Sequence, residues 1–202
     1  MNNKLLLATN NKGKLNEYRS LLKGVPFDMV SLEDEGITIE VEETGATFEE
    51  NARLKADTLA EASGLLTLAD DSGLEVDALG GEPGVRSARY AGEDATDRDR
   101  IDYLLSRLAE VPWEERTARF RCVIALAAPG GKTENCSGER RGYITLEPKG
   151  EHGFGYDPVF YLPELEKTMA EIPEEQKNRI SHRAEAAAGA RNLLENRVFD
   201  PA

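Results

Sequence analysis

Apolar runs of strand length alternate with apolar stripes at helical spacing through the first half of this chain. The runs cover residues 4–9 and 65–69, and each is short enough to form a buried strand. The stripes lie between the two runs, at Leu15, Tyr18 and Leu22 and then at Phe48, Ala52, Ala56 and Leu59. Thr47 and Glu50 form a capping-box pattern at the start of the second stripe. This alternation of elements predicts an α/β fold.

The second half of the chain predicts two paired strands and a closing helix. Every second residue is apolar over 118–126, as in a strand with one face directed inward. A turn at 129–131 and a return over 140–146 predict the partner strand. A further helix is expected over 101–108, and the last helix is expected to begin at Ser181, whose side chain can cap it. Together these signals favour a mixed sheet, with a strand order that the pattern leaves open.

Length and charge narrow the functional classes. The 202 residues suit one domain over 1–202, and 25 basic against 38 acidic residues give a formal charge of −13. That balance argues against binding to nucleic acid or to anionic membranes. It still allows an anionic small molecule, because a metal ion and a few local cations can reverse the field at one site. The longest apolar run, 122–128, is too short to cross a bilayer.

The two cysteines indicate a reducing cellular compartment and do not indicate a zinc site. Cys122 and Cys136 have no Cys or His neighbours at metal-ligand spacing, which disfavours zinc. Two cysteines also fall short of a disulfide framework, so we expect reduced thiols and a cytoplasmic protein.

A polar turn follows the first apolar run. Its residues are small, amide-bearing or cationic: Thr9, Asn10, Asn11, Lys12, Gly13 and Lys14. Backbone N–H groups and a helix N-terminus can bind an anion there, and the two lysines add full charges. The glycine spacing matches neither a Walker A loop nor a dinucleotide fingerprint. A solvated turn that caps a helix is the alternative.

Two carboxylates follow the second apolar run directly. Asp70 and Asp71 are expected at the carboxyl end of a buried strand, where ligands of open α/β sheets bind. Adjacent carboxylates repel one another unless a cation is near or one pKa is raised, and oxygen ligands of this kind suit Mg²⁺. Ser72 and Gly73 are expected to turn the chain sharply behind them, although the same four residues are also ordinary turn chemistry.

An acidic cluster and a helical pair lie between these two segments. Glu40 is expected on a solvated strand face, while at most one of Glu42 and Glu43 is expected to share a metal with Asp71. Asn51 and Lys55 are four residues apart and therefore neighbours on one helix face. The lysine is either a surface residue or a phosphate contact.

The last two motifs lie in the final third of the chain. In residues 153–158, glycines flank Phe154. Phe154 and Tyr156 offer flat faces for stacking on a base, and Asp157 offers a hydrogen-bond partner for the edge of that base. An aromatic loop packed on the core is the alternative. Lys177 precedes Ser181-His182-Arg183 at the expected helix start, where a dipole attracts anions. No serine or cysteine nucleophile with a histidine partner is signalled, which disfavours covalent acyl transfer.

Taken together, these segments resemble the inosine/xanthosine triphosphate pyrophosphatase (Ham1-like) family over nearly the whole chain. The resemblance rests on the order and intervals of six motifs, at residues 9–14, 43–52, 69–74, 81–90, 153–158 and 181–183. It implies an elongated central mixed sheet with flanking helices, two lobes around a substrate cleft, and a homodimer. It also implies Mg²⁺-dependent hydrolysis of XTP, ITP and dITP to the monophosphate and pyrophosphate, which removes these nucleotides from the pool.

The resemblance also implies roles for individual residues. Asp71 would be the catalytic acid/base and a metal ligand, with Glu43 as the second ligand. The residues expected to contact the substrate are Thr9, Asn10, Asn11, Lys12, Gly13, Lys14, Asn51, Lys55, Ser72, Phe154, Gly155, Tyr156, Asp157, Lys177, His182 and Arg183. On physical grounds we hypothesise that donors near His182 and Arg183 and in residues 154–157 read the 6-keto oxygen of the base. An adenine amino group would leave these donors unpaired, at a discrimination of up to ~10⁴-fold.

Two other functions stay open from the residues alone. One is a nucleotide hydrolase of different base specificity, acting on pyrimidine or modified nucleotides. The other is a non-catalytic nucleotide-binding module. Asp70, Asp71 and Glu43 argue against the second, because a pure binder gains nothing from mutual repulsion.

Overall fold

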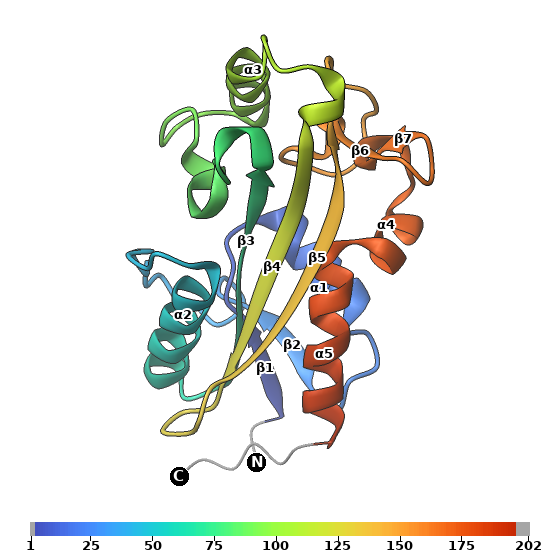
Figure 1. Ribbon diagram of the computed structural model, residues 1–202. Helices are drawn as coiled ribbons and strands as arrows, with labels where there is room; N and C mark the ends of the chain where they lie inside the picture. Colours follow the sequence, from blue (N-terminus) through green and yellow to red (C-terminus); the bar gives the residue numbers. More distant parts are fainter. Residues whose placement is uncertain (1–2, 197–202) are drawn as a thin grey trace. The chain divides into compact units, whose positions relative to one another are not determined.

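The structure, a computed structural model, describes residues 3–196. Its strands form a seven-stranded sheet in the order β2-β1-β3-β4-β5-β6-β7 (Figure 1). The strands are β1 (Lys4–Leu7), β2 (Asp28–Ser31), β3 (Leu66–Val76), β4 (Thr117–Ala127), β5 (Glu134–Ile144), β6 (Phe160–Leu162) and β7 (Lys167–Thr168). The α-helices are α1 (Lys12–Leu21), α2 (Phe48–Ser63), α3 (Asp97–Arg107), α4 (Glu174–Ile180) and α5 (His182–Asn196).

Strand pairing makes the sheet mixed. β1 is parallel to both of its neighbours, β2 and β3. β6 is antiparallel to β5 and to β7. The prediction of an α/β fold with a mixed sheet and flanking helices is therefore confirmed.

Two compact units share the chain. The first comprises residues 3–71, 122–138 and 183–196 of the described part, and the second comprises 72–121 and 139–182. The chain passes between units within β3, β4 and β5 and again after the first residue of α5. No single boundary along the sequence separates the units, which explains why composition gave no sign of one.

In the first unit, helices cover both faces of the strands. Leu5 and Leu7 share one face of β1 and pack in a core with Tyr18 of α1 and Ala190 of α5, while the equally buried Leu6 points to the other face. Figure 1 shows α2 on that other side. Thr47 caps α2 in the predicted capping box with Glu50, so this local signal is confirmed.

In the second unit, α3 packs on the distal parts of β3 and β4. Ile101 and Leu104 of α3 lie in a core with Leu74 and Phe120. Arg116 is 3% exposed, and its guanidinium donates to the carbonyls of Leu108, Val111 and Thr145. These bonds give acceptors to the N–H groups of a buried cation, and they give a donor to two carbonyls just after α3, those of Leu108 and Val111.

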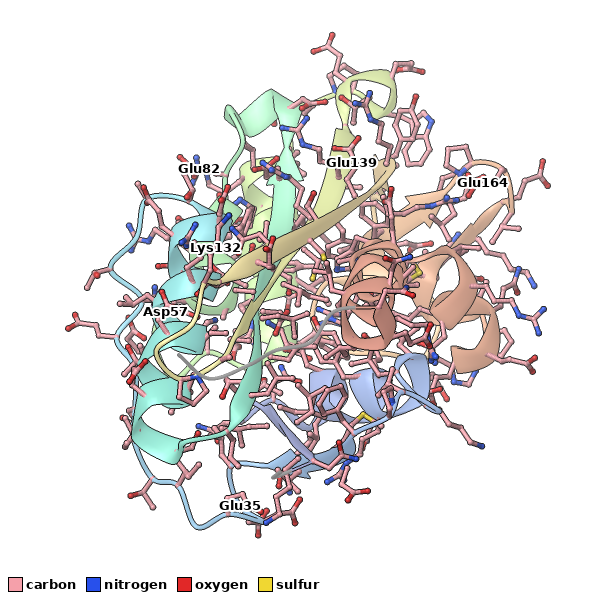
Figure 2. All side chains as sticks on the ribbon, turned by 90° about the horizontal axis from the view of Figure 1, so that it is seen from below. Glu35, Asp57, Glu82, Lys132, Glu139 and Glu164 are labelled. Carbon is pink, nitrogen blue, oxygen red and sulfur yellow. The ribbon has the colours of Figure 1, made fainter. Side chains whose placement is uncertain are left out.

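Charged side chains lie mainly at the periphery. Figure 2 labels Glu82, Lys132, Glu139 and Glu164, all of which are exposed. Among residues 3–196, no helix is long and apolar enough to span a membrane.

The structure corrects four of the sequence expectations. β3 does not end before Asp70 but continues through residues 70–73 to Val76, because strand pairing outweighs local turn chemistry. The expected strand around Glu40 is absent from the described residues. β4 alternates in burial only up to Arg121 and is buried on both faces from Cys122 onward. β5 begins at Glu134, six residues before the expected start.

Candidate functional site

Side chains alternate along β3, which places Asp70 and Asp71 on opposite faces of the sheet. Successive residues of a strand point to opposite faces. Asp70 lies on the face of α1 and α5, where its Oδ2 is 2.9 Å from Lys14 Nζ. Asp71 lies on the face of α2, where its Oδ2 accepts a 3.0 Å hydrogen bond from Asn51 Nδ2. The sequence predicted repulsion unless a cation is near or one pKa is raised, and both conditions are met: Lys14 lies beside Asp70, and the pKa of Asp71 is raised.

Cations surround Asp70. Arg183, at the start of α5, lies with Nε 3.9 Å from Asp70 Oδ2, and its Nη1 donates to Glu17 Oε2 at 2.5 Å. Arg183 also lies over the ring of Tyr18, 5.9 Å from the centroid. Asp70, Arg183 and Glu17 are all 5% exposed or less. This is a buried ionic network that joins α1, β3 and α5.

The network keeps Asp70 charged. Burial opposes its ionisation, but Lys14, Arg183 and Lys55 outweigh this and lower the pKa of Asp70 well below its usual range. For Arg183, burial likewise disfavours the cation, while Glu17, Tyr18 and Asp70 raise the pKa. Both groups are therefore ionised near neutral pH.

The predicted phosphate loop is shorter than expected. Asn11 is the N-cap of α1, and its side chain accepts a hydrogen bond from the Lys14 backbone N–H. Lys12, Gly13 and Lys14 therefore lie in the first turn of the helix rather than in a loop. Asn10, Asn11 and Lys12 are exposed. This end of α1 presents backbone N–H groups and a lysine to solvent, as an anion site requires.

Asp71 belongs to a second cluster, built on α2. Asn51 is 1% exposed, and besides donating to Asp71 its Oδ1 accepts from the Gly45 N–H at 2.7 Å. A Cβ at Gly45 would lie 2.7 Å from Asn51 Oδ1, so this close approach requires glycine. Lys55 Nζ pairs with Glu43 Oε1 at 2.5 Å, and the Lys55 side chain is 14% exposed. Lys55 is therefore an interior cation of the cluster and not a solvated surface lysine.

The electrostatics of Asp71 are opposite to those of Asp70. Burial is the largest influence and raises the pKa of Asp71; Glu43 raises it further, and Lys55 only partly offsets both. For Lys55, burial lowers the pKa, but Asp70, Asp71 and Glu43 outweigh burial and raise it. Asp71 is thus a carboxylate that would gain from an additional positive charge.

These oxygens fit a hard divalent cation. Asp71 and Glu43 supply carboxylates in one charged cluster, and their coupling already raises the pKa of Asp71. Among residues 3–196, no group of three or more His, Cys, Asp or Glu side chains is arranged to hold a metal. Mg²⁺ commonly takes one or two protein carboxylates and completes its shell with phosphate oxygens and water. The cluster therefore suits a metal that arrives with a phosphate ligand.

The second unit holds the glycine-flanked aromatic segment, which we call the recognition loop (residues 153–157). Gly153 and Gly155 have φ of +76° and +62°, conformations that favour glycine. A Cβ at Gly153 would lie 2.0 Å from Asp157 Oδ2. Asp157 is 3% exposed; it accepts from the Phe154 N–H at 2.9 Å and pairs with Lys177 Nζ at 2.5 Å.

The two aromatic rings of the recognition loop have different surroundings. Phe154 is half-buried, and Lys177 Nζ lies 4.6 Å from its ring centroid. Tyr156 is 5% exposed, and its hydroxyl donates to the Ser87 carbonyl at 2.9 Å. The face of Tyr156 is therefore used in the core, and the alternative of an aromatic loop packed on the core holds for this ring. Phe154 is the more exposed of the two rings.

His182 and Ser72 also lie in the second unit. His182 is 4% exposed and stacks on Phe120, with 4.8 Å between the ring centroids. Phe120 in turn packs against Phe160. Ser72 is half-buried within β3 and does not begin a turn. The aromatic stack holds the imidazole in one orientation.

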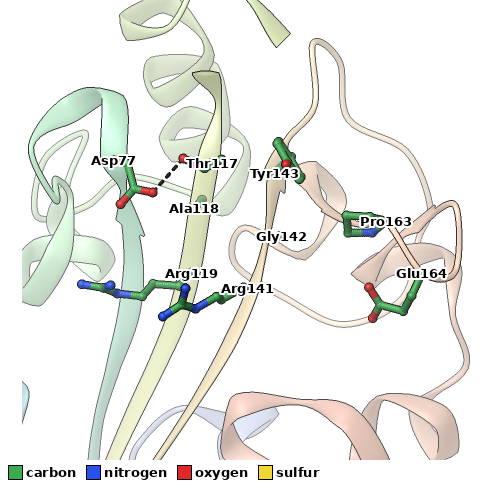
Figure 3. A pocket seen from close by; sticks show the side chains of 9 residues that line it. All are labelled: Asp77, Thr117, Ala118, Arg119, Arg141, Gly142, Tyr143, Pro163 and Glu164. Carbon is green, nitrogen blue, oxygen red and sulfur yellow. Dashed lines mark hydrogen bonds between the residues drawn. The ribbon is translucent and has the colours of Figure 1, made fainter. Parts of the chain in front are cut away.

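A cavity of about 380 Å³ lies elsewhere in the second unit (Figure 3). Strands β4 and β5 and the segment after β6 line it, with residues Asp77, Thr117, Ala118, Arg119, Arg141, Gly142, Tyr143, Pro163 and Glu164. Its charges are matched: Arg119 pairs with Glu75, Arg141 with Glu139, and Thr117 donates to Asp77. It contains none of the predicted site residues, so the candidate site lies elsewhere.

Two residues of the first unit were missed by sequence reasoning. Asp70 was noted only as one of a repelling pair, yet it holds Lys14 and Arg183. Glu17 was not considered, although it anchors Arg183. The signal for Glu17 was its place three residues after Lys14 and beside the apolar Tyr18, which puts it on the buried side of α1.

Comparisons with known proteins agree with this architecture. The model of the Ham1 family matches residues 5–193. A relative from Geobacter sulfurreducens, named dITP/XTP pyrophosphatase, is 57% identical over 185 residues, which cover 92% of this chain and 93% of the relative. A protein of the same name from Bacillus subtilis is 50% identical over 190 residues, which cover 94% of this chain and 96% of its own.

Solved structures give the same result. The Ham1 protein of Staphylococcus aureus is 44% identical, with a TM-score of 0.85 over 95% of this chain and 98% of its own. A HAM1 protein from Coxiella burnetii is 42% identical, with a TM-score of 0.86 over the same shares of the two chains.

Proposed function

The chain belongs to the Ham1 family, and from that membership we propose that it hydrolyses XTP, ITP and dITP to the nucleoside monophosphate and pyrophosphate. The observation that carries the proposal is the agreement of relatives named dITP/XTP pyrophosphatase, at 50% and 57% identity over more than nine-tenths of the chain. The cluster around Asp71 supplies the chemistry that such a reaction needs. In this role the enzyme removes these nucleotides from the pool.

The first unit supplies groups that suit a triphosphate. The N-terminus of α1, with Thr9, Asn10, Asn11 and Lys12, binds phosphate oxygens through backbone N–H groups and positive charge. Lys14 and Lys55 add cations that offset the negative charge of the substrate and of the protein. Asn51 orients Asp71 through its 3.0 Å hydrogen bond.

Asp71 acts on the attacking water. Without a metal, burial raises the pKa of Asp71 toward the range of an effective general base; a bound cation would lower that pKa and make Asp71 a ligand, so the two roles are alternatives. Glu43 and Asp71 would hold Mg²⁺, which when bound neutralises phosphate oxygens and lowers the pKa of water. Lys55 stays protonated beside Glu43 and limits charge build-up on the phosphates.

The second unit supplies groups that suit a purine base. Phe154 offers a half-buried ring for stacking, and Asp157 holds Lys177 with its Nζ 4.6 Å from the centroid of that ring. His182, which stacks on Phe120, donates to the 6-keto oxygen. Gly155, Tyr156 and Asp157 shape the loop and are proposed to contact the nucleoside. Arg183, in the first unit, is likewise a proposed substrate contact. An adenine amino group would leave these donors unpaired, which accounts for rejection of ATP.

A product assay tests the proposal. Purified protein is incubated with XTP, dITP, GTP or ATP, with and without Mg²⁺, and nucleotide and phosphate products are separated. We expect the monophosphate and pyrophosphate from XTP and dITP, far less from GTP and ATP, and none without a divalent cation. Release of orthophosphate would refute the cleavage position. A preference for pyrimidine or canonical purine nucleotides would favour the hydrolase of different specificity, and binding without turnover would favour the non-catalytic module.

The remaining expectations are proposals of organisation. We propose that residues 1–202 form a single functional domain, that the protein is a cytoplasmic homodimer, and that it takes no nucleic-acid partner. The net charge of −13 supports the last point, since a nucleic-acid binder needs a positive face. Light scattering coupled to gel filtration tests the dimer, with a mass near twice 22.2 kDa expected.

A further inference from the structure

The recognition loop depends on anchors outside its own sequence. Two bonds are internal: the Phe154 N–H donates to Asp157 Oδ2 at 2.9 Å, and the Asp157 N–H donates to the Phe154 carbonyl at 3.3 Å. Three others reach other elements: Lys177 Nζ of α4 donates to Asp157 Oδ2 at 2.5 Å, the Gly155 N–H donates to Asp97 Oδ2 at 2.7 Å, and the Tyr156 hydroxyl donates to the Ser87 carbonyl at 2.9 Å. The loop is therefore held by α4 and by two outside anchors that precede it in the chain, the first residue of α3 and the 3₁₀ helix of residues 84–89.

Arg100 joins the two outside anchors. Its guanidinium donates to the Ala88 carbonyl at 2.8 Å and to the Ala95 carbonyl at 2.6 Å, and it pairs with Asp97 Oδ1. Because Ala88 follows Ser87 directly, one side chain ties the segment that accepts from Tyr156 to the carboxylate that accepts from Gly155. The Arg100 side chain is 18% exposed, so its bonds are partly shielded from water.

Asp97 is not needed to cap α3. The capping box is made by Thr96 and Asp99: Thr96 accepts from the Asp99 N–H, and Asp99 accepts from the Thr96 N–H at 2.9 Å. Asp97 lies one residue after the cap, where its charge suits the helix dipole but its oxygens are used by Gly155 and Arg100. The Asp97 side chain therefore bonds to the loop and to Arg100 and takes no part in the capping box of α3.

The bond to Gly155 matters because the loop is otherwise permissive. Gly153 and Gly155 stand on either side of Phe154, and glycine loses the most conformational freedom on ordering. Without an acceptor for the Gly155 N–H, the backbone after Phe154 loses one restraint, while the bonds between Phe154 and Asp157 remain. The Phe154 ring would then sample a wider range of directions, and each substrate molecule would have to restrict it on binding.

We propose that Asp97, supported by Arg100, is a positioning residue for base recognition: it fixes the recognition loop so that Phe154 and Lys177 are preorganised for the purine. The inference rests on the proposed function of the loop. Asp97 contacts neither the phosphates nor the reacting water, and it acts on the substrate only through Gly155. Its loss therefore weakens binding of the nucleotide more than it slows the chemical step.

Steady-state kinetics with XTP test the inference. Asp97→Ala is expected to raise KM by about 10-fold, while kcat stays within about twofold, because one charge-assisted hydrogen bond to the loop is lost. Asp97→Asn keeps an acceptor oxygen and is expected to restore most of the affinity. Asp99→Ala is the matched control: it removes a carboxylate of the same helical turn, lowers thermal stability through the capping box, and is expected to leave KM unchanged.

A ligand without a base separates recognition from general damage. Inorganic tripolyphosphate is used as a competitive inhibitor of XTP hydrolysis, and its inhibition constant is expected to be the same in Asp97→Ala and the parent protein. An equal weakening of XTP and tripolyphosphate would overturn the inference, as would an unchanged KM for XTP, a fall in kcat alone, or an equal rise of KM in Asp99→Ala.

A measurement on the substrate-free protein tests the positioning role of Asp97 separately from the proposed hydrolase function. Amide hydrogen exchange at Gly155 is followed by NMR in the substrate-free protein. We expect protection in the parent and in Asp99→Ala, and exchange at least ~10-fold faster in Asp97→Ala. Equal exchange in all three proteins would overturn the positioning role even if XTP is hydrolysed. Failure of the parent to hydrolyse XTP, with Gly155 still protected by Asp97, would instead reject the proposed function.

Discussion

Asp70 and Asp71 are adjacent in β3 and equally acidic in isolation, yet the two faces of the strand give them opposite properties. On one face, Lys14 and Arg183 lower the pKa of Asp70. On the other, burial and Glu43 raise the pKa of Asp71, despite Lys55. The protein itself supplies the cations beside Asp70, whereas the charged form of Asp71 would still be stabilised by a cation that arrives with a ligand. The comparison teaches that adjacent residues of one strand can carry carboxylates with opposite pKa shifts.

The largest expected effect is on the Asp71 face. Asp71→Asn is expected to lower turnover of XTP by about 10²–10⁴-fold, the range that a general base contributes. The variant should fold and be at least as stable as the parent at neutral pH, because the raised pKa means that the charge of Asp71 costs stability in the folded state. Initial rates and thermal melting of the same preparation measure both. The exposed Asp94→Asn serves as the control, and near-normal rates in Asp71→Asn would remove Asp71 from the mechanism.

The second effect is on the Asp70 face and concerns stability. Asp70→Asn leaves the buried Arg183 and Lys14 with one anion fewer and is expected to lower the free energy of unfolding by about 3 kcal/mol. Urea unfolding measures the change. Asp34→Asn is the matched control, since Asp34 pairs with Arg19 on the surface and its loss should cost less than about 1 kcal/mol. Equal effects of the two substitutions would contradict a buried network at Asp70.

The pH dependence of stability should separate the two faces by sign. A lowered pKa means that Asp70 stabilises the fold above the unfolded value near 4, and that this contribution is lost as the pH falls through the folded value. Asp71, whose pKa is raised, contributes the reverse: its charge destabilises the fold as the pH rises from about 4 through its folded pKa.

Urea unfolding from acid to neutral pH, in metal-free buffer, tests this contrast. The stability difference between the parent and Asp70→Asn should shrink toward low pH. The difference between the parent and Asp71→Asn should favour the variant at neutral pH and vanish in acid. Curves that change in parallel would show that the two carboxylates are equivalent.

The smallest effect is on a thiol that shares the Asp70 face. Burial, and then Asp70, raises the pKa of Cys122 to about 12. Asp70→Asn should therefore shift the onset of Cys122 alkylation to lower pH by less than about one unit, because burial is unchanged. Asp71→Asn should leave the onset in place. Mass spectrometry of the Cys122 peptide after alkylation at a series of alkaline pH values distinguishes the two variants. An equal shift of the onset in both variants would contradict a specific effect of Asp70 on Cys122.

Local signals in the sequence predicted the elements well. The capping box of Thr47 and Glu50 and the stripe through Phe48 and Ala52 identified α2, because both depend only on residues a few positions apart. The family resemblance is confirmed by the matching family model. The roles that the resemblance assigns to single residues stay predictions.

The site itself could be predicted only in part. Residues 70–73 resemble a turn when considered locally, and only pairing within the sheet makes them strand. The separation of Asp70 from Asp71 follows from that one fact. The Lys55–Glu43 pair and the Glu17–Arg183 pair join residues 12 and 166 positions apart, and such contacts depend on packing that no local pattern encodes. Tyr156 was expected to face a base because its burial could not be seen in the sequence.

A side-by-side comparison of Asp70→Asn and Asp71→Asn tests the division of roles most directly. Both variants are assayed for kcat at saturating XTP and Mg²⁺, at a temperature where melting curves show each to be folded. We predict that Asp70→Asn keeps a kcat within about tenfold of the parent, whereas Asp71→Asn loses at least about 100-fold. Equal losses of kcat in the two variants, or a larger loss in Asp70→Asn, would contradict the assignment of chemistry to one face of β3.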